Sequence, residues 1–170
     1  MKKRKKIPNV SKPNGSRIPT AELPKSNVTF DFQYKNWLQS FKKGEFTTFL
    51  KDSDEYADFI TQILTELIPK ITKDWEPGKQ GFKHCHTIPM EDDAYQLYSS
   101  AIKRLHNLHT EQLTLWQFGL SQGCRLICYL QGKTIYPLLI DYHHLGYPSL
   151  YYNQKDFKNY NYCPMTKNKI

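Results

Sequence analysis

The sequence predicts an α+β fold in which about four antiparallel strands form one sheet and the helices pack on one of its faces. Two observations lead to this prediction. Residues 113–140 contain three apolar runs separated by short breaks with a glycine, the pattern of a three-strand antiparallel meander. One alternating segment and two segments of helical periodicity precede them. The expected order is therefore a strand, helices, and then three strands.

The first half of the chain supplies the single strand and the longer helix. Residues 28–34 alternate apolar and polar side chains, which is typical of a half-buried strand. A short helical segment is expected at Phe46–Lys51. Asp52 and Glu55 have the spacing of a capping box, so a helix should start there and should end or kink at Pro69. Its expected buried stripe is Tyr56, Phe59, Ile60, Ile63, Leu64, Leu67 and Ile68.

The second helix is expected after a long connection at residues 70–90. Asp92 or Asp93 can cap this helix, which should run to about Leu108. The side chains at helical spacing, expected to be buried, are Tyr95, Tyr98, Ala101, Ile102 and Leu105. His106 and His109 follow one turn apart near its end, where a surface or capping role is expected.

The meander gives its middle strand two different faces. The expected strands are Leu113–Leu120, Cys124–Leu130 and Thr134–Ile140. Because successive side chains of a strand point to opposite sides, one face of the middle strand is apolar and the other is mixed. We expect the apolar face to pack on the helices and the mixed face to stay open and line a cleft. The apolar face holds Cys124, Leu126, Cys128 and Leu130, and the mixed face holds Arg125, Ile127 and Tyr129.

Most of the positive charge lies in an N-terminal arm. The net charge is +8, and residues 1–26 hold eight basic residues but only one acidic residue. We therefore predict a flexible arm at 1–26, which either solubilises the chain or binds phosphate, and one domain at 27–170 with a tyrosine-rich C-terminal extension. No apolar run is long enough to span a membrane, which predicts a cytoplasmic protein. The arm's candidate nucleic-acid-binding residues are Lys2, Lys3, Arg4, Lys5 and Lys6.

The cysteines and histidines predict neither a cofactor nor a metal. Cys124 and Cys128 stand four residues apart on one strand, roughly 13 Å, which is too far for two ligands of one zinc ion. No secretion signal accompanies the four cysteines, so a disulfide framework is not expected. The alternative is a zinc module built on His84 and His86, for which the sequence shows no second pair of ligands.

A cluster of side chains capable of acid–base chemistry follows the last strand. Asp141, His143, His144 and Tyr147 stand where the chain leaves the sheet, although Asp141 and one histidine can equally well serve the backbone there. Arg125 cannot lose its proton, so its candidate role is to stabilise an anionic phosphate, and a structural salt bridge is the alternative. Together with Tyr129, these residues suggest a metal-independent ribonuclease site.

The segment LWQFGLSQGCRLICYLQGKTIYPLLIDYHHLGYP and the order of elements resemble the RelE/YoeB/ParE superfamily of bacterial toxins. The resemblance implies a RelE-like fold and an endoribonuclease that acts on mRNA, in some members on the ribosome, with an antitoxin protein as partner. It puts Arg125 at the phosphate-stabilising position, His144 at the general-acid or general-base position, with His143 as the alternative, and Tyr147 at the aromatic position.

A rival hypothesis keeps the fold without the chemistry. In this interpretation the chain is a non-catalytic module that binds nucleic acid or a protein, and the basic arm at 1–26 makes the contact. Its binding should depend steeply on salt, because each phosphate contact releases counterions.

Overall fold

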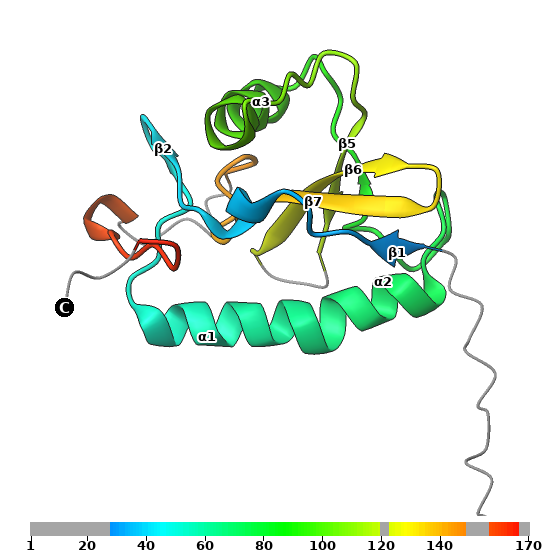
Figure 1. The fold of residues 1–170 in the computed structure, drawn as a ribbon, viewed down its shortest axis with the longest axis horizontal. Coiled ribbons are helices and arrows are strands. Elements are labelled where there is room, and N and C mark those ends of the chain that lie inside the picture. The colour runs from blue at the N-terminus through cyan, green and yellow to red at the C-terminus, as the bar shows by residue number, and fades with distance from the viewer. Residues whose placement is uncertain (1–27, 120–122, 149–156, 167–170) are drawn as a thin grey trace, which may run out of the picture.

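The structure, a computed structural model, describes residues 28–119, 123–148 and 157–166. A five-stranded sheet with the order β1-β7-β6-β5-β4 runs through the molecule (Figure 1). β1 lies parallel to β7, and all other neighbours are antiparallel. The strands are β1 (Thr29–Phe30), β4 (His86–Thr87), β5 (Leu115–Phe118), β6 (Arg125–Gln131) and β7 (Thr134–Asp141).

The predicted α+β class and the meander β5-β6-β7 are confirmed, but the expected sheet was wrong in two respects. It is mixed rather than antiparallel, because β1 pairs with β7 in the same direction. It also has a fifth strand, β4, which lies within the expected connection at 70–90. Since β4 has only two residues, it shows no alternation from which it could have been recognised.

One long helical rod covers one face of the sheet. It consists of α1 (Ser53–Gln62), a π-helical turn (Ile63–Leu67) and α2 (Ile68–Asp74). Asp52 caps the helix as predicted, since its Oδ1 accepts a hydrogen bond from the Glu55 amide at 2.9 Å, but the return bond from Glu55 goes to the residue before the cap rather than to Asp52. Glu55 Oε2 in turn accepts one from the amide of Lys51 at 2.7 Å.

Pro69 does not end this rod. A proline inside a helix lacks an amide donor, and its ring crowds the carbonyl four residues earlier. The wider π-helical turn directly before α2 relieves this conflict, and Pro69 takes a position in the first turn of α2, where no donor is needed. The helix therefore continues to Asp74 and adds Ile71 to the buried side chains.

The second long helix, α3 (Asp93–His106), covers the opposite face of the sheet (Figure 1). The expectation that helices occupy one face only was therefore wrong. The apolar face of β6, with Leu126 and Cys128, packs in a cluster with Ile63 and Ile71 of the rod. The mixed face does not stay open, because Ile127 and Tyr129 pack in a second cluster with the buried stripe of α3. The α3 side chains of that cluster include Tyr95, Tyr98, Ala101 and Ile102.

Strand β7, which lies between β1 and β6, contains a β-bulge. Ile127 pairs with Leu139 and the next residue, Cys128, pairs with Pro137, so Leu138 is the extra residue. Both Leu138 and Leu139 consequently pack in the α3 cluster. His106 Nε2 donates a hydrogen bond to the Leu138 carbonyl at 2.7 Å. The bulge thus accommodates a proline within the sheet and ties the end of α3 to it.

A small hairpin stands beside α3. β2 (Lys42–Lys43) and β3 (Phe46–Thr47) pair across a turn at Gly44, so the short helix expected at Phe46–Lys51 was wrong. A 3-10 turn at Lys35–Leu38 precedes the hairpin, and a second one at Phe157–Asn159 lies in the C-terminal segment. None of the helices in the described ranges combines the length and the apolar composition needed to cross a membrane.

Candidate functional site

Arg125 lies at the start of β6, on the face of the sheet that α3 covers. Its side chain is only 4% exposed. Nη1 donates to the Cys124 carbonyl at 2.8 Å, and Nη2 donates to Nδ1 of His84 at 3.3 Å. The guanidinium lies against Gly119, where a Cβ atom would stand 2.8 Å from Nη1. The absence of a side chain at Gly119 therefore gives Arg125 the room for its position.

Asp141 pairs with Arg125 in the sheet, but its carboxylate holds the following loop. Oδ1 accepts a hydrogen bond from the Leu145 amide at 3.0 Å, and Oδ2 accepts from the Gly146 amide and from Tyr98 Oη, both at 2.8 Å. Gly146 lies so close to Tyr98 that no other residue fits there. Asp141 therefore accepts hydrogen bonds from backbone amides, which was the alternative to a catalytic role, and it fixes the loop that carries His144.

His144 lies in the loop after Asp141 and has a backbone conformation that is rare for residues other than glycine. Its φ of 56° is left-handed, a conformation that is concentrated at functional sites. Burial and, secondly, the charge of Arg125 lower its pKa, so its imidazole is neutral near pH 7. Its Nδ1 is buried without a hydrogen-bond partner in the described part of the chain. A neutral imidazole of this kind can accept a proton.

Two further histidines complete the group. His84 accepts from Arg125 at Nδ1, so its neutral form carries the proton on Nε2. Burial and then the charge of Arg125 lower the pKa of His84 as well. His86 Nδ1 donates to its neighbour's carbonyl at 2.9 Å, which leaves Nε2 to accept from Gln117 Nε2 at 3.0 Å. We call Arg125, His84, His86, Gln117 and His144 the Arg125 cluster.

His84 of the Arg125 cluster lines a cavity. The cavity measures about 340 Å³ and is lined in part by His84 and by Gly119, on which Arg125 packs. Two cations, Lys70 and Lys83, also line it, and none of its described lining residues is acidic. Gln117 Oε1 is buried nearby in the cluster without a partner among the described residues. Unsatisfied buried polar atoms beside a positive cavity are expected where a polar ligand binds.

The two adjacent histidines after β7 lie in different surroundings. His143 Nε2 donates to the Phe49 carbonyl at 2.9 Å, and its ring stacks on Phe157 at 4.3 Å and contacts Phe59 of α1. His143 therefore belongs to the side of the sheet covered by the rod. Of the two alternatives, only His144 comes together with Arg125.

The remaining candidates from the sequence are placed as follows. Tyr147 lies near His144, with ring centroids 6.0 Å apart, and donates from Oη to Asp92 Oδ2 at 2.6 Å. Tyr129 is 9% exposed and stacks on Tyr136 at 4.6 Å, so its ring would have to leave this stack to contact nucleic acid. The five basic residues at positions 2–6 lie outside the described residues.

Among the described residues, no group of three or more His, Cys, Asp and Glu side chains is arranged to hold a metal ion. His84 and His86, the two ligands of the zinc alternative, instead bond to Arg125 and Gln117. Sequence reasoning considered them only as metal ligands and missed them as neighbours of Arg125. The missing signal was β4, whose pairing with β5 brings His86 opposite Gln117.

Comparison with known proteins identifies the family of the chain. The family described as "Uncharacterised protein UU032" matches residues 33–170. A protein of Ureaplasma parvum serovar 3, named "Uncharacterized protein UU032", is 37% identical over 165 residues, which cover 91% of this chain and 93% of that protein. No solved structure matches the chain significantly. The chain therefore belongs to the UU032 family.

Proposed function

We propose that the protein is a RelE-like, metal-independent endoribonuclease that acts on mRNA in the cytoplasm, with the Arg125 cluster as its catalytic site. The observation that carries the proposal is a buried guanidinium that bonds to His84 and, after burial, lowers the pKa of His144 and His84, beside a cavity whose described lining holds no acidic side chain. Such a combination supplies a cation for the phosphate and a base that is unprotonated at neutral pH.

In the proposed reaction, His144 accepts the proton of a ribose 2′-hydroxyl. The 2′-oxygen then attacks the adjacent phosphorus, and the bond to the 5′-oxygen breaks. His144 returns its proton to this leaving oxygen, so the products are a 2′,3′-cyclic phosphate and a 5′-hydroxyl, and no co-reactant is needed. Arg125 stabilises the extra negative charge of the phosphorane. His84 donates from Nε2 to a phosphate oxygen, and Tyr147 orients the ring of His144.

The test is the rate at which purified variants cleave single-stranded RNA in the presence of a metal chelator. His144→Asn removes the base, and asparagine tolerates the left-handed backbone at this position. Arg125→Lys keeps the charge but loses the forked donor geometry. We expect each variant to lower the rate by about 10²-fold or more.

The matched control is His143→Gln, which changes the neighbouring imidazole outside the cluster and should leave the rate within a few-fold of the wild type. Wild-type rates in His144→Asn and Arg125→Lys would refute the proposed chemistry. For a ribosome-dependent enzyme, the same variants are compared by growth arrest and by mapping mRNA 5′ ends after induced expression. An antitoxin would be detected as a co-purifying protein that suppresses the arrest.

The rival function, a non-catalytic module that binds through residues 1–26, depends on a segment outside the described residues. Deleting residues 1–26 separates the two proposals. An enzyme should keep its reaction on saturating RNA, whereas a module whose arm makes the contact should lose its binding.

A further inference from the structure

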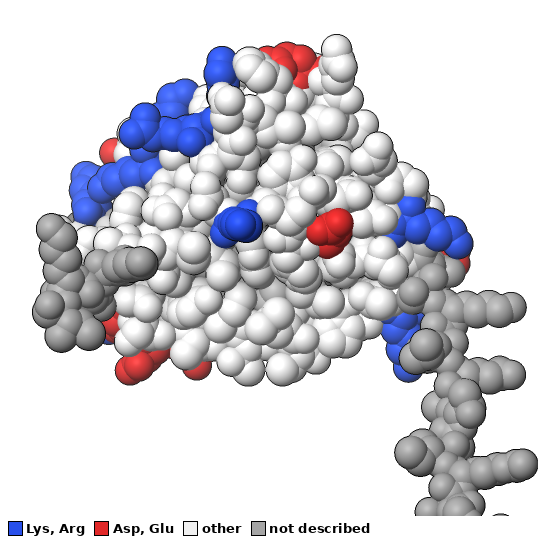
Figure 2. Space-filling view, viewed as in Figure 1, with Lys and Arg blue, Asp and Glu red and all other residues white. Residues whose placement is uncertain are grey.

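A second basic region lies away from the Arg125 cluster, between the β2–β3 hairpin and α3. Figure 2 shows that Lys and Arg side chains gather over β2 and the adjoining part of α3, whereas much of the rest of this face carries few charges. The region is hollowed into a cleft of about 850 Å³. We call it the hairpin cleft, and its lining includes Lys42, Lys43, Phe49, Ser100 and Arg104.

Among the described residues, no acidic side chain pairs with the cations of the hairpin cleft. Lys43 Nζ donates to Ser100 Oγ at 3.0 Å, and Lys42 Nζ donates to the Lys158 carbonyl at 3.4 Å, so both have neutral acceptors. Neither lysine nor Arg104 forms an ion pair with a described residue, and the part of the cleft lining that the structure describes holds no acidic side chain. Cations gathered without counter-charges create a potential that attracts anions.

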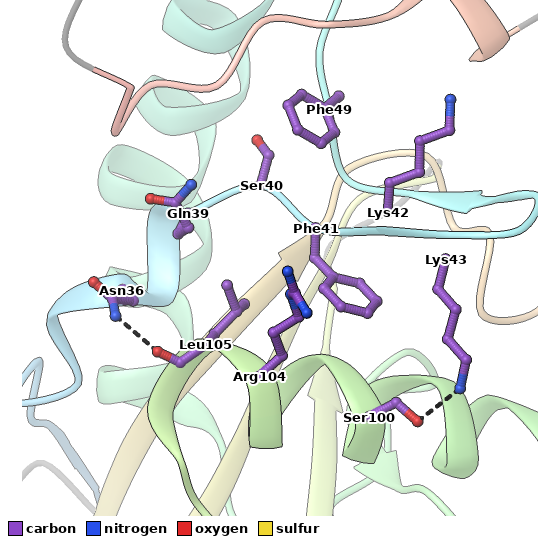
Figure 3. Close-up of a pocket in the computed structure, with 10 residues that line it drawn as sticks. All are labelled: Asn36, Gln39, Ser40, Phe41, Lys42, Lys43, Phe49, Ser100, Arg104 and Leu105. Atoms are coloured by element: carbon purple, nitrogen blue, oxygen red, sulfur yellow. Dashed lines mark hydrogen bonds between the residues drawn. The ribbon is translucent and has the colours of Figure 1, made fainter.

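The rest of the lining has the groups that accompany phosphates in nucleotides. Figure 3 shows the half-buried Phe49 ring on one side of the cleft and Arg104 on the other, with Ser40 and Phe41 between them in this view and Gln39 to one side. An aromatic ring can stack on a base, and amide and hydroxyl groups can bond to a sugar or a base edge. Asn36 Nδ2 donates to the Leu105 carbonyl at 2.7 Å and ties the wall of the cleft to the end of α3. Together with the bond from Lys43 to Ser100, it connects both the 3-10 turn at Lys35–Leu38 and the hairpin to α3.

We propose that the hairpin cleft binds the phosphate groups of nucleotides, with Lys42, Lys43 and Arg104 on the phosphates and Phe49 against a base. The phosphates come either from the backbone of a single-stranded nucleic acid or from a free nucleotide. This site is separate from the Arg125 cluster and does not depend on the ribonuclease chemistry. In an RNA-cleaving enzyme, it holds the substrate beyond the cleaved bond.

The test uses the full chain and two ligands that it cannot cleave. A fluorescent single-stranded DNA oligonucleotide, which has no 2′-hydroxyl, tests the backbone, and ATP tests the free nucleotide. The cleft variant is Lys42→Gln/Lys43→Gln/Arg104→Gln. The matched control, Lys73→Gln/Lys79→Gln/Lys133→Gln, removes the same charge from exposed positions outside the cleft and keeps residues 1–26.

The cleft variant should weaken binding of at least one ligand by tenfold or more relative to the charge-matched control. If the ligand is the oligonucleotide, the slope of log K against log salt should also become shallower by about 2, because three phosphate contacts are lost. If it is ATP alone, the site is for a free nucleotide. The proposal is overturned if the wild type binds neither ligand or if both triple variants bind equally. Either result can be obtained whether or not the protein cleaves RNA.

Discussion

Both faces of β6 are buried, but apolar packing stabilises one face and hydrogen bonds from a buried cation contribute on the other. On the side of the rod, Leu126 and Cys128 contact other apolar side chains, and their burial is satisfied by packing alone. On the side of α3, the same strand begins with Arg125, and the buried polar groups there require specific partners. A face packed by apolar contact tolerates rearrangement, whereas a face with buried polar groups is specified atom by atom.

The largest expected effect is on the apolar face. Leu126→Ala should lower the free energy of unfolding by about 2–5 kcal/mol, because Leu126 is fully buried and its loss leaves a cavity. Urea denaturation measures the change. Leu64→Ala, at a position in the rod that is 50% exposed, is the control and should change stability by no more than about 0.5 kcal/mol. Similar losses in both variants would contradict the packing described for this face.

The next largest effect compares the stability contributed by two hydrogen bonds of α3, one to a carboxylate and one to a neutral carbonyl. Tyr98→Phe removes a hydroxyl that donates to the carboxylate of Asp141, and it should cost about 1.5–3 kcal/mol. Tyr95→Phe on the same helix removes a donor to the Thr110 carbonyl at 2.7 Å and should cost about 0.5–1.5 kcal/mol. Equal losses would show that the carboxylate does not organise this face.

The smallest effect is a pH dependence that only the α3 face should produce. Burial lowers the pKa of His84, His106 and His144 in the folded protein, so the unfolded chain binds more protons below the ordinary value of about 6.5. The stability that comes from keeping these imidazoles neutral is complete above that value. It is lost as the pH falls through the folded pKa values.

Urea denaturation between pH 7.5 and 5 measures this dependence. The free energy of unfolding should fall towards pH 5, and His144→Asn should remove part of the slope, because one of the contributing imidazoles is absent. A variant with the full wild-type slope would mean that His144 is not held neutral by its surroundings.

The sequence was sufficient for the parts of the fold that depend on periodicity. The cap at Asp52, the stripe of α3 and the apolar face of β6 follow regular patterns, and the structure has them. The double cover of the sheet could have been noticed in the continuous apolar run of β7, which is typical of a strand buried on both faces.

The candidate site was only partly predictable, because its contacts link distant parts of the chain. Arg125 and His144 were selected by residue type and position. The separation of His143 from His144 depends on a left-handed backbone at His144, which the sequence does not reveal because only a few per cent of residues other than glycine adopt it. His84 joins Arg125 across 41 positions through pairing near a two-residue strand, which has no periodic pattern.

The most direct test of the central claim, that the Arg125 cluster cleaves RNA, is an analysis of the product ends. Purified protein is incubated with a single-stranded RNA and with the same RNA carrying 2′-deoxyribose at the cleaved position, both with a metal chelator. The account predicts a 2′,3′-cyclic phosphate and a 5′-hydroxyl from the RNA, no cut in the deoxy substrate, and loss of cleavage in His144→Asn. A 5′-phosphate product, cleavage of the deoxy substrate, or undiminished cleavage by His144→Asn would contradict it.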